Sequence, residues 1–379
     1  MKHRLLITIL VFSFLALPLM AACVQEAPVP APAPAPVPAP APAPVPAPAP
    51  VPSDEVFTFS FSWSDYGPVH QASVVFAPGG LYQRELYNRS NGRIRLNITP
   101  WAYEDVLAAI MQGKTDMGDF ATPDYAETNP LWVWQEIPGV TDAGSSIITG
   151  LWQERAVLNH PRMIQIWDET FREFDAKYLF SAPWGGENSI WSTKEIINLD
   201  DVIGMKIQAS GLIGTFVVEA LGGAAIPSEE EQGPALLSGV IDATATGKDY
   251  GYSIGLTEIA DYIIEVPINC GWTGSTLMRA DLWDSLPPDI QDIMMEVGHD
   301  VEAAIFMGTA AHAAYAEQFI TDSGVTVVPL TQDEKVEVKE LLAPIRDMWL
   351  EEAGPYGPEV LSIVDEVVNG YSAFDKFPR

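Results

Sequence analysis

The chain has 379 residues, of which 20 are Lys or Arg and 51 are Asp or Glu, so its formal net charge at pH 7 is −31. This excess of acid argues against a nucleic-acid partner, because nucleic-acid binding depends on basic side chains that neutralise phosphates. The two cysteines are Cys23 and Cys270. Only Cys270 lies in the part expected to fold, so no internal disulfide is expected.

The N-terminus reads as a targeting segment. A basic start is followed by a 15-residue apolar run at 5–19, which is short for a membrane span of about 20 residues and fits the core of a signal peptide. The run closes on Met20-Ala21-Ala22-Cys23, which resembles a bacterial lipobox, with Met20 where Leu or Val is usual. We expect a signal peptide at 1–22 and a lipid on Cys23. Plain secretion with a free Cys23 is the alternative.

A proline repeat follows the cysteine. Every second residue from Ala27 to Pro52 is proline, which excludes helix and sheet because proline has no N–H to donate. An extended polyproline helix rises about 3.1 Å per residue, so this tract spans roughly 80 Å. Residues 23–52 are therefore predicted to be a stiff spacer between a membrane anchor and a folded domain at 53–379.

The folded part alternates strand-like and helical segments. Strands are expected at 56–61, 93–99, 178–182, 205–207, 239–243 and 262–266. Helices are expected at 104–112 and at 287–321, the second interrupted near Gly308. Strands separated by helices favour an α/β fold with parallel sheets.

Catalytic patterns are absent from the sequence. It has no Walker phosphate loop, no GxGxxG after a strand, no HExxH and no GxSxG, and its five histidines lack metal-ligand spacing. The 11 tryptophans mostly lie near expected loops or strand ends. Core packing is the default explanation for them, although loop aromatics also line small-molecule pockets.

Five short motifs stand in order along the folded part. They are Tyr-Asn-Arg-Ser-Asn-Gly-Arg-Ile at 87–94, Ile-Met-Gln-Gly-Lys-Thr-Asp-Met-Gly at 110–118, Leu-Asp-Asp-Val-Ile-Gly-Met-Lys-Ile at 199–207, Ala-Leu-Gly-Gly at 220–223 with Pro227, Glu231 and Gly-Val-Ile-Asp-Ala at 239–243, and Leu-Trp-Asp-Ser-Leu-Pro at 282–287. In this order they resemble the solute-binding subunit of tripartite ATP-independent periplasmic (TRAP) transporters, DctP type. The stretches 241–244 and 270–272 are most similar to the branch that binds 2-oxo acids and related monocarboxylates.

The chain departs from that branch at positions that contact the ligand. Gln208 stands where the branch has an arginine that pairs with the ligand carboxylate, and Glu187 stands where it has glutamine. Ala245 and Thr246 replace a Glu-Trp pair whose glutamate binds a cation beside the ligand. Lys248 is the only basic residue nearby.

These departures change the expected ligand. A buried carboxylate facing Gln208 and Glu187 would be costly without a compensating cation. We therefore expect a neutral or cationic ligand, or a ligand bound through a metal ion, Ca²⁺ or Na⁺, held by Glu187; otherwise no cofactor is expected. The alternative is that Lys248 has taken over the role of the arginine.

The resemblance implies a two-lobed fold of the periplasmic-binding-protein type, with hinge strands and a long connecting helix. The first lobe would hold about 53–184 and part of 272–330, and the second about 185–270 and the C-terminal helices. A ligand would bind between lobes that close by a hinge. The candidate ligand-binding residues are Trp63, Tyr66, His70, Asp119, Phe120, Trp184, Glu187, Asn188, Gln208, Thr246, Lys248 and Trp272. For His70 and Phe120, a structural role is an equal alternative.

The implied function is capture of a small organic solute outside the cytoplasm and its delivery to an ion-coupled TRAP permease. No catalysis is expected, and no nucleic acid. The rival classes are a binding subunit for an ATP-driven importer or a sensor, and a lipid-anchored hydrolase that uses Glu187 with a second carboxylate.

Overall fold

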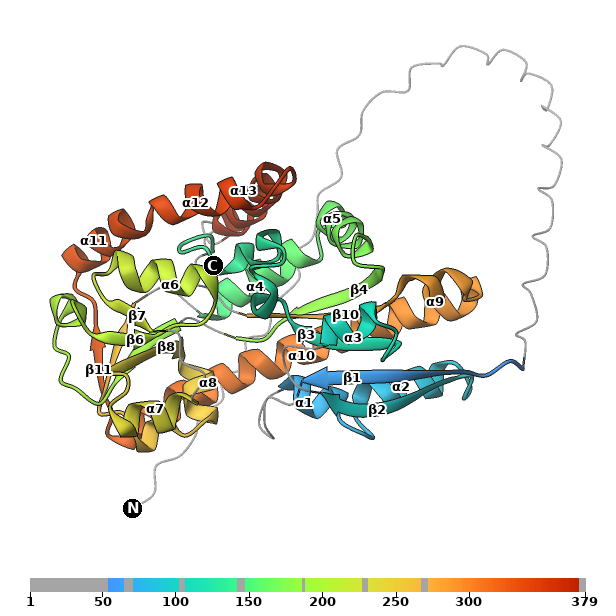
Figure 1. Cartoon of the computed structure of the whole chain (residues 1–379), viewed down its shortest axis with the longest axis horizontal. Helices are drawn as coiled ribbons and strands as arrows, with labels where there is room; N and C mark the ends of the chain where they lie inside the picture. The colour runs from blue at the N-terminus through green and yellow to red at the C-terminus, as the bar shows by residue number, and fades with distance from the viewer. Residues whose placement is uncertain are drawn as a thin grey trace, which may run out of the picture. The chain divides into compact units, whose positions relative to one another are not determined.

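The computed structural model of the chain describes residues 54–64, 71–101, 106–141, 147–185, 188–226, 231–266 and 272–374. Residues 52–379 form one compact unit, in which helices surround two β-sheets (Figure 1). The α/β class expected from the sequence is confirmed.

The first sheet has the strand order β2-β1-β3-β10-β4. Its strands are β1 (Phe57–Ser64), β2 (Ile94–Trp101), β3 (Met117–Ala121), β4 (Ala176–Pro183) and β10 (Thr273–Arg279). Strand β1 runs parallel to β2 and β3, whereas β10 runs antiparallel to β3 and β4. The strands expected at 56–61, 93–99 and 178–182 overlap β1, β2 and β4.

The second sheet has the strand order β11-β9-β5-β8-β6-β7. Its strands are β5 (Asn188–Ser192), β6 (Lys206–Gln208), β7 (Ala224–Ile226), β8 (Ala243–Gly247), β9 (Tyr262–Glu265) and β11 (Thr326–Pro329). The strand expected at 239–243 is wrong, because Gly239 ends a helix with φ 74° and the strand begins only at Ala243. Glycine favours this left-handed position because it has no Cβ.

Neither sheet is fully parallel, which corrects the expectation of parallel sheets. Strand β5 runs antiparallel to β8 and β9, as β10 does to its neighbours. Both reversed strands follow directly from a strand of the other sheet, β4 before β5 and β9 before β10. A strand that enters a sheet at the edge where the neighbouring strands end must run in the opposite direction.

Helices cover both faces of the first sheet. Helices α1 (Gln71–Phe76), α2 (Leu81–Arg89) and part of α10 (Pro288–Ser323) pack on one face, and α3 (Val106–Met111) and α5 (Pro161–Arg172) on the other. Further elements near this sheet are η2 (Thr122–Tyr125), η3 (Pro130–Glu136), α4 (Ile147–Leu158) and α9 (Ala280–Ser285).

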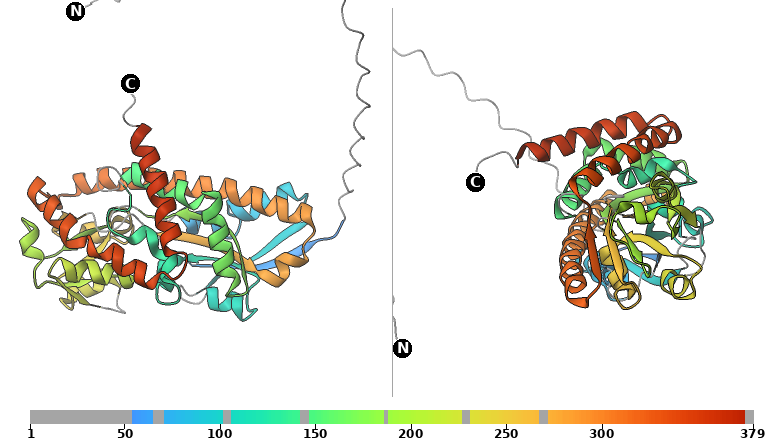
Figure 2. Two further views of the ribbon diagram at one scale, coloured as in Figure 1. Left: turned by 90° about the horizontal axis from the view of Figure 1, so that it is seen from above. Right: turned by 90° about the vertical axis from the view of Figure 1, so that its left-hand side faces the viewer.

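The second sheet packs on α6 (Gly211–Ala220) with one face and contacts α7 (Gln232–Ser238) and α8 (Lys248–Ser253) with the other. Short 3-10 helices lie beside it, η5 (Leu199–Val202) and η6 (Leu256–Glu258). The chain ends in α11 (Gln332–Leu342), α12 (Pro344–Glu352) and α13 (Gly357–Phe374), drawn in red in Figure 2. Helices α11 and α12 contact α6, whereas α13 contacts α4 and η3.

The longest helix, α10, connects the two halves of the unit. It runs for 36 residues without a break, so the interruption expected near Gly308 is wrong. A helix-interior glycine costs only about 1 kcal/mol, and α10 packs on β4, α2, α4 and α8 along its length. Among the described residues, no helix is at once long and apolar enough to cross a membrane.

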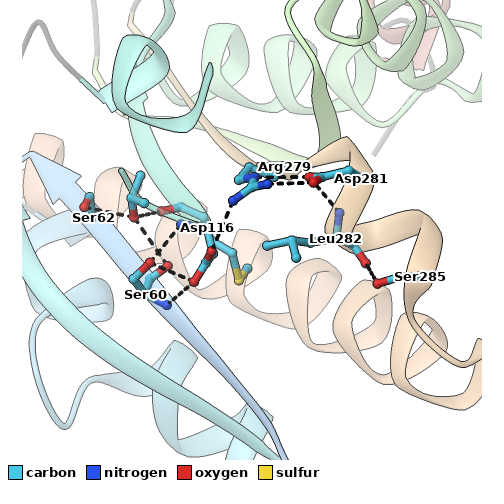
Figure 3. Close-up of polar contacts among 9 residues, drawn as sticks. Ser60, Ser62, Asp116, Arg279, Asp281, Leu282 and Ser285 are labelled. Atoms are coloured by element: carbon cyan, nitrogen blue, oxygen red, sulfur yellow. Dashed lines mark hydrogen bonds and ion pairs between the residues drawn. The ribbon is translucent and has the colours of Figure 1, made fainter. Parts of the chain in front are cut away.

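The motif at 110–118 has a structural explanation (Figure 3). The Asp116 carboxylate accepts hydrogen bonds from the backbone N–H and the hydroxyl of Ser60, both at 2.8 Å, and lies 3.9 Å from the Arg279 guanidinium. Asp281 holds the same guanidinium at 2.6 Å. The motif therefore ties the start of β3 to β1 and to the end of β10, and it fixes the scaffold of the first sheet.

Candidate functional site

Each sheet has one edge at which the chain crosses to the other sheet, from β4 to β5 and from β9 to β10. In the first sheet, β1, β3 and β4 end and β10 begins at the edge near Trp63, Ala121, Pro183 and Thr273, here called the first edge. Five residue steps separate Pro183 from Asn188, a reach of at most about 18 Å. The carboxyl ends of strands in open α/β sheets are the usual place for a ligand.

The second edge belongs to the second sheet. Strands β6, β8 and β9 end there at Gln208, Gly247 and Glu265, and β5 begins there at Asn188. The sequence prediction placed Asn188, Gln208 and Thr246 in the site, and the sheet register brings all three backbones to this edge.

Three predicted tryptophans stand at or near the first edge. The backbone N–H of Trp184 donates to the backbone carbonyl of Trp272 at 2.6 Å. This bond joins the end of β4 to the start of β10. The Trp184 ring lies so close to Gly274 that an added Cβ would meet it at 1.8 Å. Trp63 and Trp184 pack in one apolar cluster, with Trp272 partly buried against it.

Asp119 lies beside Trp63 in the sheet register, but its side chain is buried at 2% exposure on the face covered by α1, α2 and α10. Its carboxylate accepts a hydrogen bond from the Thr276 hydroxyl at 2.6 Å. Burial raises the pKa of Asp119 to about 8, although the bond from Thr276 opposes the shift. The carboxyl group is therefore mostly protonated in the folded protein at pH 7.

Phe120 points to the opposite face of the same strand. Its ring is fully buried and packs edge-on against Tyr125 at 4.9 Å and Phe171 at 6.2 Å between ring centroids. Because successive side chains alternate across a strand, Phe120 and Asp119 do not share one face. Of the two readings of Phe120, the structure favours a role in the core.

The second edge carries buried, uncharged polar groups. Gln208 pairs in register with Thr244, and Ser189 with Thr246, and these four side chains are at most 8% exposed. The hydroxyls of Ser189 and Thr244 have no hydrogen-bond partner among the described residues. This face can therefore accept or donate neutral hydrogen bonds.

Lys248 is held by carboxylates. Its ammonium lies 2.7 Å from Glu265 and 2.8 Å from Glu317. Burial lowers the pKa of Lys248, but the bonds to these two carboxylates outweigh it and raise the pKa above its ordinary value. The lysine therefore stays charged and its charge is balanced within the protein.

Several predicted residues lie outside the described residues, namely Cys23, Tyr66, His70, Cys270 and Glu187, and for Asn188 only the backbone is described. No group of three or more His, Cys, Asp or Glu side chains suited to a metal ion occurs within the described ranges. The proposed metal ligand Glu187 thus stays a prediction.

Sequence reasoning missed three buried polar side chains near the first edge: Gln135 and Glu136 at the end of η3, and Glu154 in α4. All are at most 1% exposed. The Gln-Glu pairs at 135–136 and 153–154, the second followed by Arg155, lie within largely apolar segments. An acid within such a segment is the signal that could have singled them out.

Comparison with known proteins places this geometry in context. Residues 59–352 match the family DctP, described as bacterial extracellular solute-binding protein, family 7. A Bordetella pertussis extracytoplasmic solute receptor binding pyroglutamic acid has a similar fold, with a TM-score of 0.69 and 15% identity over 82% of this chain and 99% of that one.

Two further structures share the fold. A sugar acid binding protein from Advenella mimigardefordensis, in complex with galactonate, has a TM-score of 0.70 and 16% identity over 83% of this chain and 99% of that one. A TRAP periplasmic solute-binding protein from Desulfovibrio desulfuricans, with bound sn-glycerol-3-phosphate, has a TM-score of 0.72 and 17% identity over 82% and 97%. The family match covers most of the chain, and the two-lobed fold agrees with it. The chain therefore belongs to the DctP family of bacterial extracellular solute-binding proteins, family 7.

Proposed function

We propose that this solute-binding protein captures a small organic solute between its first and second edges and delivers it to an ion-coupled TRAP permease. The observation that carries the proposal is the pair of strand edges brought together where β4 leads to β5 and β9 leads to β10. Hinge closure of two lobes around a ligand needs such short connections. Reversible binding requires no chemistry, and the family consists of receptors.

The ligand we propose is neutral or cationic. Gln208 offers an amide where relatives of the 2-oxo-acid branch would offer a guanidinium, and an amide brings no charge to a carboxylate. Lys248 already faces Glu265 and Glu317, so its charge is balanced before any ligand carboxylate binds. For this reason we assign Lys248 to the scaffold, and we treat a cation held by Glu187 as the alternative.

We further propose that Cys23 carries a lipid and that the proline tract holds the binding domain away from the membrane. The apolar run at 5–19 and the small residues before Cys23 support the anchor. The repeat at 27–52 supports a stiff spacer. Mass spectrometry of the membrane fraction tests this: a diacylglycerol-modified N-terminal cysteine is expected, and an intact or otherwise cleaved terminus would contradict it.

A thermal-shift screen of residues 52–379 tests the binding function. The panel holds carboxylates, 2-oxo acids, amines, polyols and sugars, each with and without Ca²⁺. A solute at 100 times its Kd stabilises the folded state by about 2.7 kcal/mol, which is easily seen as a rise in Tm. We expect neutral or cationic solutes to stabilise the protein without Ca²⁺. Stabilisation by monocarboxylates alone would contradict the proposed ligand class.

A further inference from the structure

Three buried oxygen atoms near the first edge lack hydrogen-bond donors. They are Gln135 Oε1, Glu136 Oε2 and Glu154 Oε2, here called the acceptor cluster, and none has a partner among the described residues. The three side chains are 0%, 1% and 0% exposed. Buried polar atoms are almost always hydrogen-bonded, so three such oxygens without a partner indicate a group that is yet to bind.

A hydrogen-bond network joins two members of the acceptor cluster to the first edge. The Thr273 hydroxyl donates to Glu154 Oε1 at 2.7 Å. The Thr122 hydroxyl donates to the Thr273 carbonyl at 3.2 Å, and Gln135 Nε2 donates to the Thr122 hydroxyl at 3.4 Å. The amide oxygen of Gln135 and the second carboxyl oxygen of Glu154 are therefore positioned by Thr122, directly after β3, and by Thr273 at the start of β10.

The third member of the acceptor cluster reaches toward the second sheet. A Cβ added to Gly211 would lie 3.6 Å from Glu136 Oε2. Gly211 begins α6, three residues after Gln208 at the end of β6. The Glu136 carboxyl group therefore lies beside the start of α6, near the second edge. The solute is proposed to bind at this edge.

The two carboxyl groups of the acceptor cluster have no basic partner among the described ion pairs. Arg155, next to Glu154 in sequence, forms two hydrogen bonds to Glu302 at 2.7 and 2.8 Å instead. Burial raises the pKa of Glu136 and that of Glu154 to about 8 each. A bound cation would favour the ionised form of both carboxyl groups and so lower the two pKa values again.

We propose that the acceptor cluster binds a protonated amino group of the transported solute, an inference that rests on the proposed function. An ammonium group donates three hydrogen bonds and brings the positive charge that would hold the two buried carboxyl groups in their ionised form. A hydroxyl group donates one and brings none. The cluster therefore selects amines over alcohols and acids of the same size.

The rest of the site is compatible with a cation. Gln208, Thr244 and Ser189 on the second edge are uncharged, and the ammonium of Lys248 is balanced by Glu265 and Glu317. The net charge of −31 also attracts cationic solutes to the protein surface at low ionic strength.

Matched sets of probes test the inference. Each set carries one carbon skeleton ending in ammonium, hydroxyl or carboxylate groups, for example putrescine, 1,4-butanediol and succinate, and skeletons from two to six carbons are screened by thermal shift and titration calorimetry. The amine of at least one set should bind, and the Glu154→Gln variant should bind it about 10- to 100-fold more weakly, as expected for loss of a charged hydrogen bond.

The controls separate binding from folding. Glu154→Gln keeps an acceptor for Thr273, so its Tm without solute should equal that of the parent protein. If the Tm of Glu154→Gln is lower, Glu136→Gln tests the same inference. Glu296→Gln, an exposed acid of α10, should leave amine affinity unchanged. Binding of the acid or alcohol alone, absence of amine binding, or amine affinity that survives both cluster variants would overturn the inference. The proposed function fails separately, if no solute of the wider panel binds.

Discussion

At the scale of single residues, burial of acids is the feature with the clearest thermodynamic consequence. Asp119 has a pKa of about 8 in the folded protein, against an ordinary value of 3.8. The folded state therefore holds a proton that the unfolded state releases between these two values. Linkage requires stability to fall as pH rises through this window.

The substitution Asp119→Asn tests this prediction. Asparagine has the same shape and can still accept from Thr276, but it does not titrate. The free energy of unfolding of the parent protein should fall between pH 5 and pH 8, and that of the variant should fall less. The two slopes should differ by at most about 1.4 kcal/mol per pH unit. Glu296→Gln serves as the exposed control. Equal slopes for the parent protein and Asp119→Asn would show that Asp119 does not hold the proton.

Some of the site residues could be predicted from the sequence, and others could not. Trp63, Trp184 and Trp272 could be placed at strand ends because apolar strands and their boundaries are visible in the sequence. The hydrogen bond from Thr273 to Glu154 could not be foreseen, because the two residues lie 119 positions apart, and the burial of Glu154 was missed because acids in helices are usually exposed. Phe120 and Asp119 are neighbours in sequence and lie on opposite faces of β3. Only the packing of α1, α2 and α10 on one of these faces shows that Asp119 is the residue beneath them.

At the scale of elements, α10 and the strand crossings determine the architecture. The helix was visible as a long apolar periodicity, but its continuity past Gly308 depends on packing against β4, α2, α4 and α8. The reversal of β5 and β10 depends on where the chain crosses between sheets, which no local pattern records. A strand was predicted at 239–243 because the segment is mostly apolar. Gly239 instead ends α7 in a left-handed conformation, which the apolar pattern does not record.

Lys248 gives a prediction at this scale, because it joins α8 to β9 and α10. Lys248→Met removes the cation between Glu265 and Glu317 and should destabilise the protein by about 1–2 kcal/mol, since Glu317 is largely exposed and its charge is screened. Solute affinity should change by less than about twofold. Urea unfolding and titration calorimetry measure the two quantities.

The matched control for Lys248 is Lys335→Met, an exposed lysine of α11, which should change neither quantity. A large loss of solute affinity in Lys248→Met, with stability unchanged, would restore Lys248 as the group that replaces the missing arginine.

At the scale of the whole molecule, the family and the fold define a receptor, and the particular side chains define its ligand class. The two lobes, the hinge strands and the connecting helix could be predicted because five motifs in order resemble one family. The ligand class could only be inferred from departures at single positions such as Gln208. The acceptor cluster required coordinates, because its members come from η3 and α4 and two of them, Gln135 and Glu154, are linked through Thr122 and Thr273.

The central claim is reversible capture of one solute without conversion. The most direct measurement is titration calorimetry of residues 52–379 with the best solute of the screen, followed by unfolding of the saturated protein and mass spectrometry of what it releases. The account predicts one solute per chain, recovered unchanged after prolonged incubation. Recovery of a chemically altered product, or saturation without a defined stoichiometry, would contradict it.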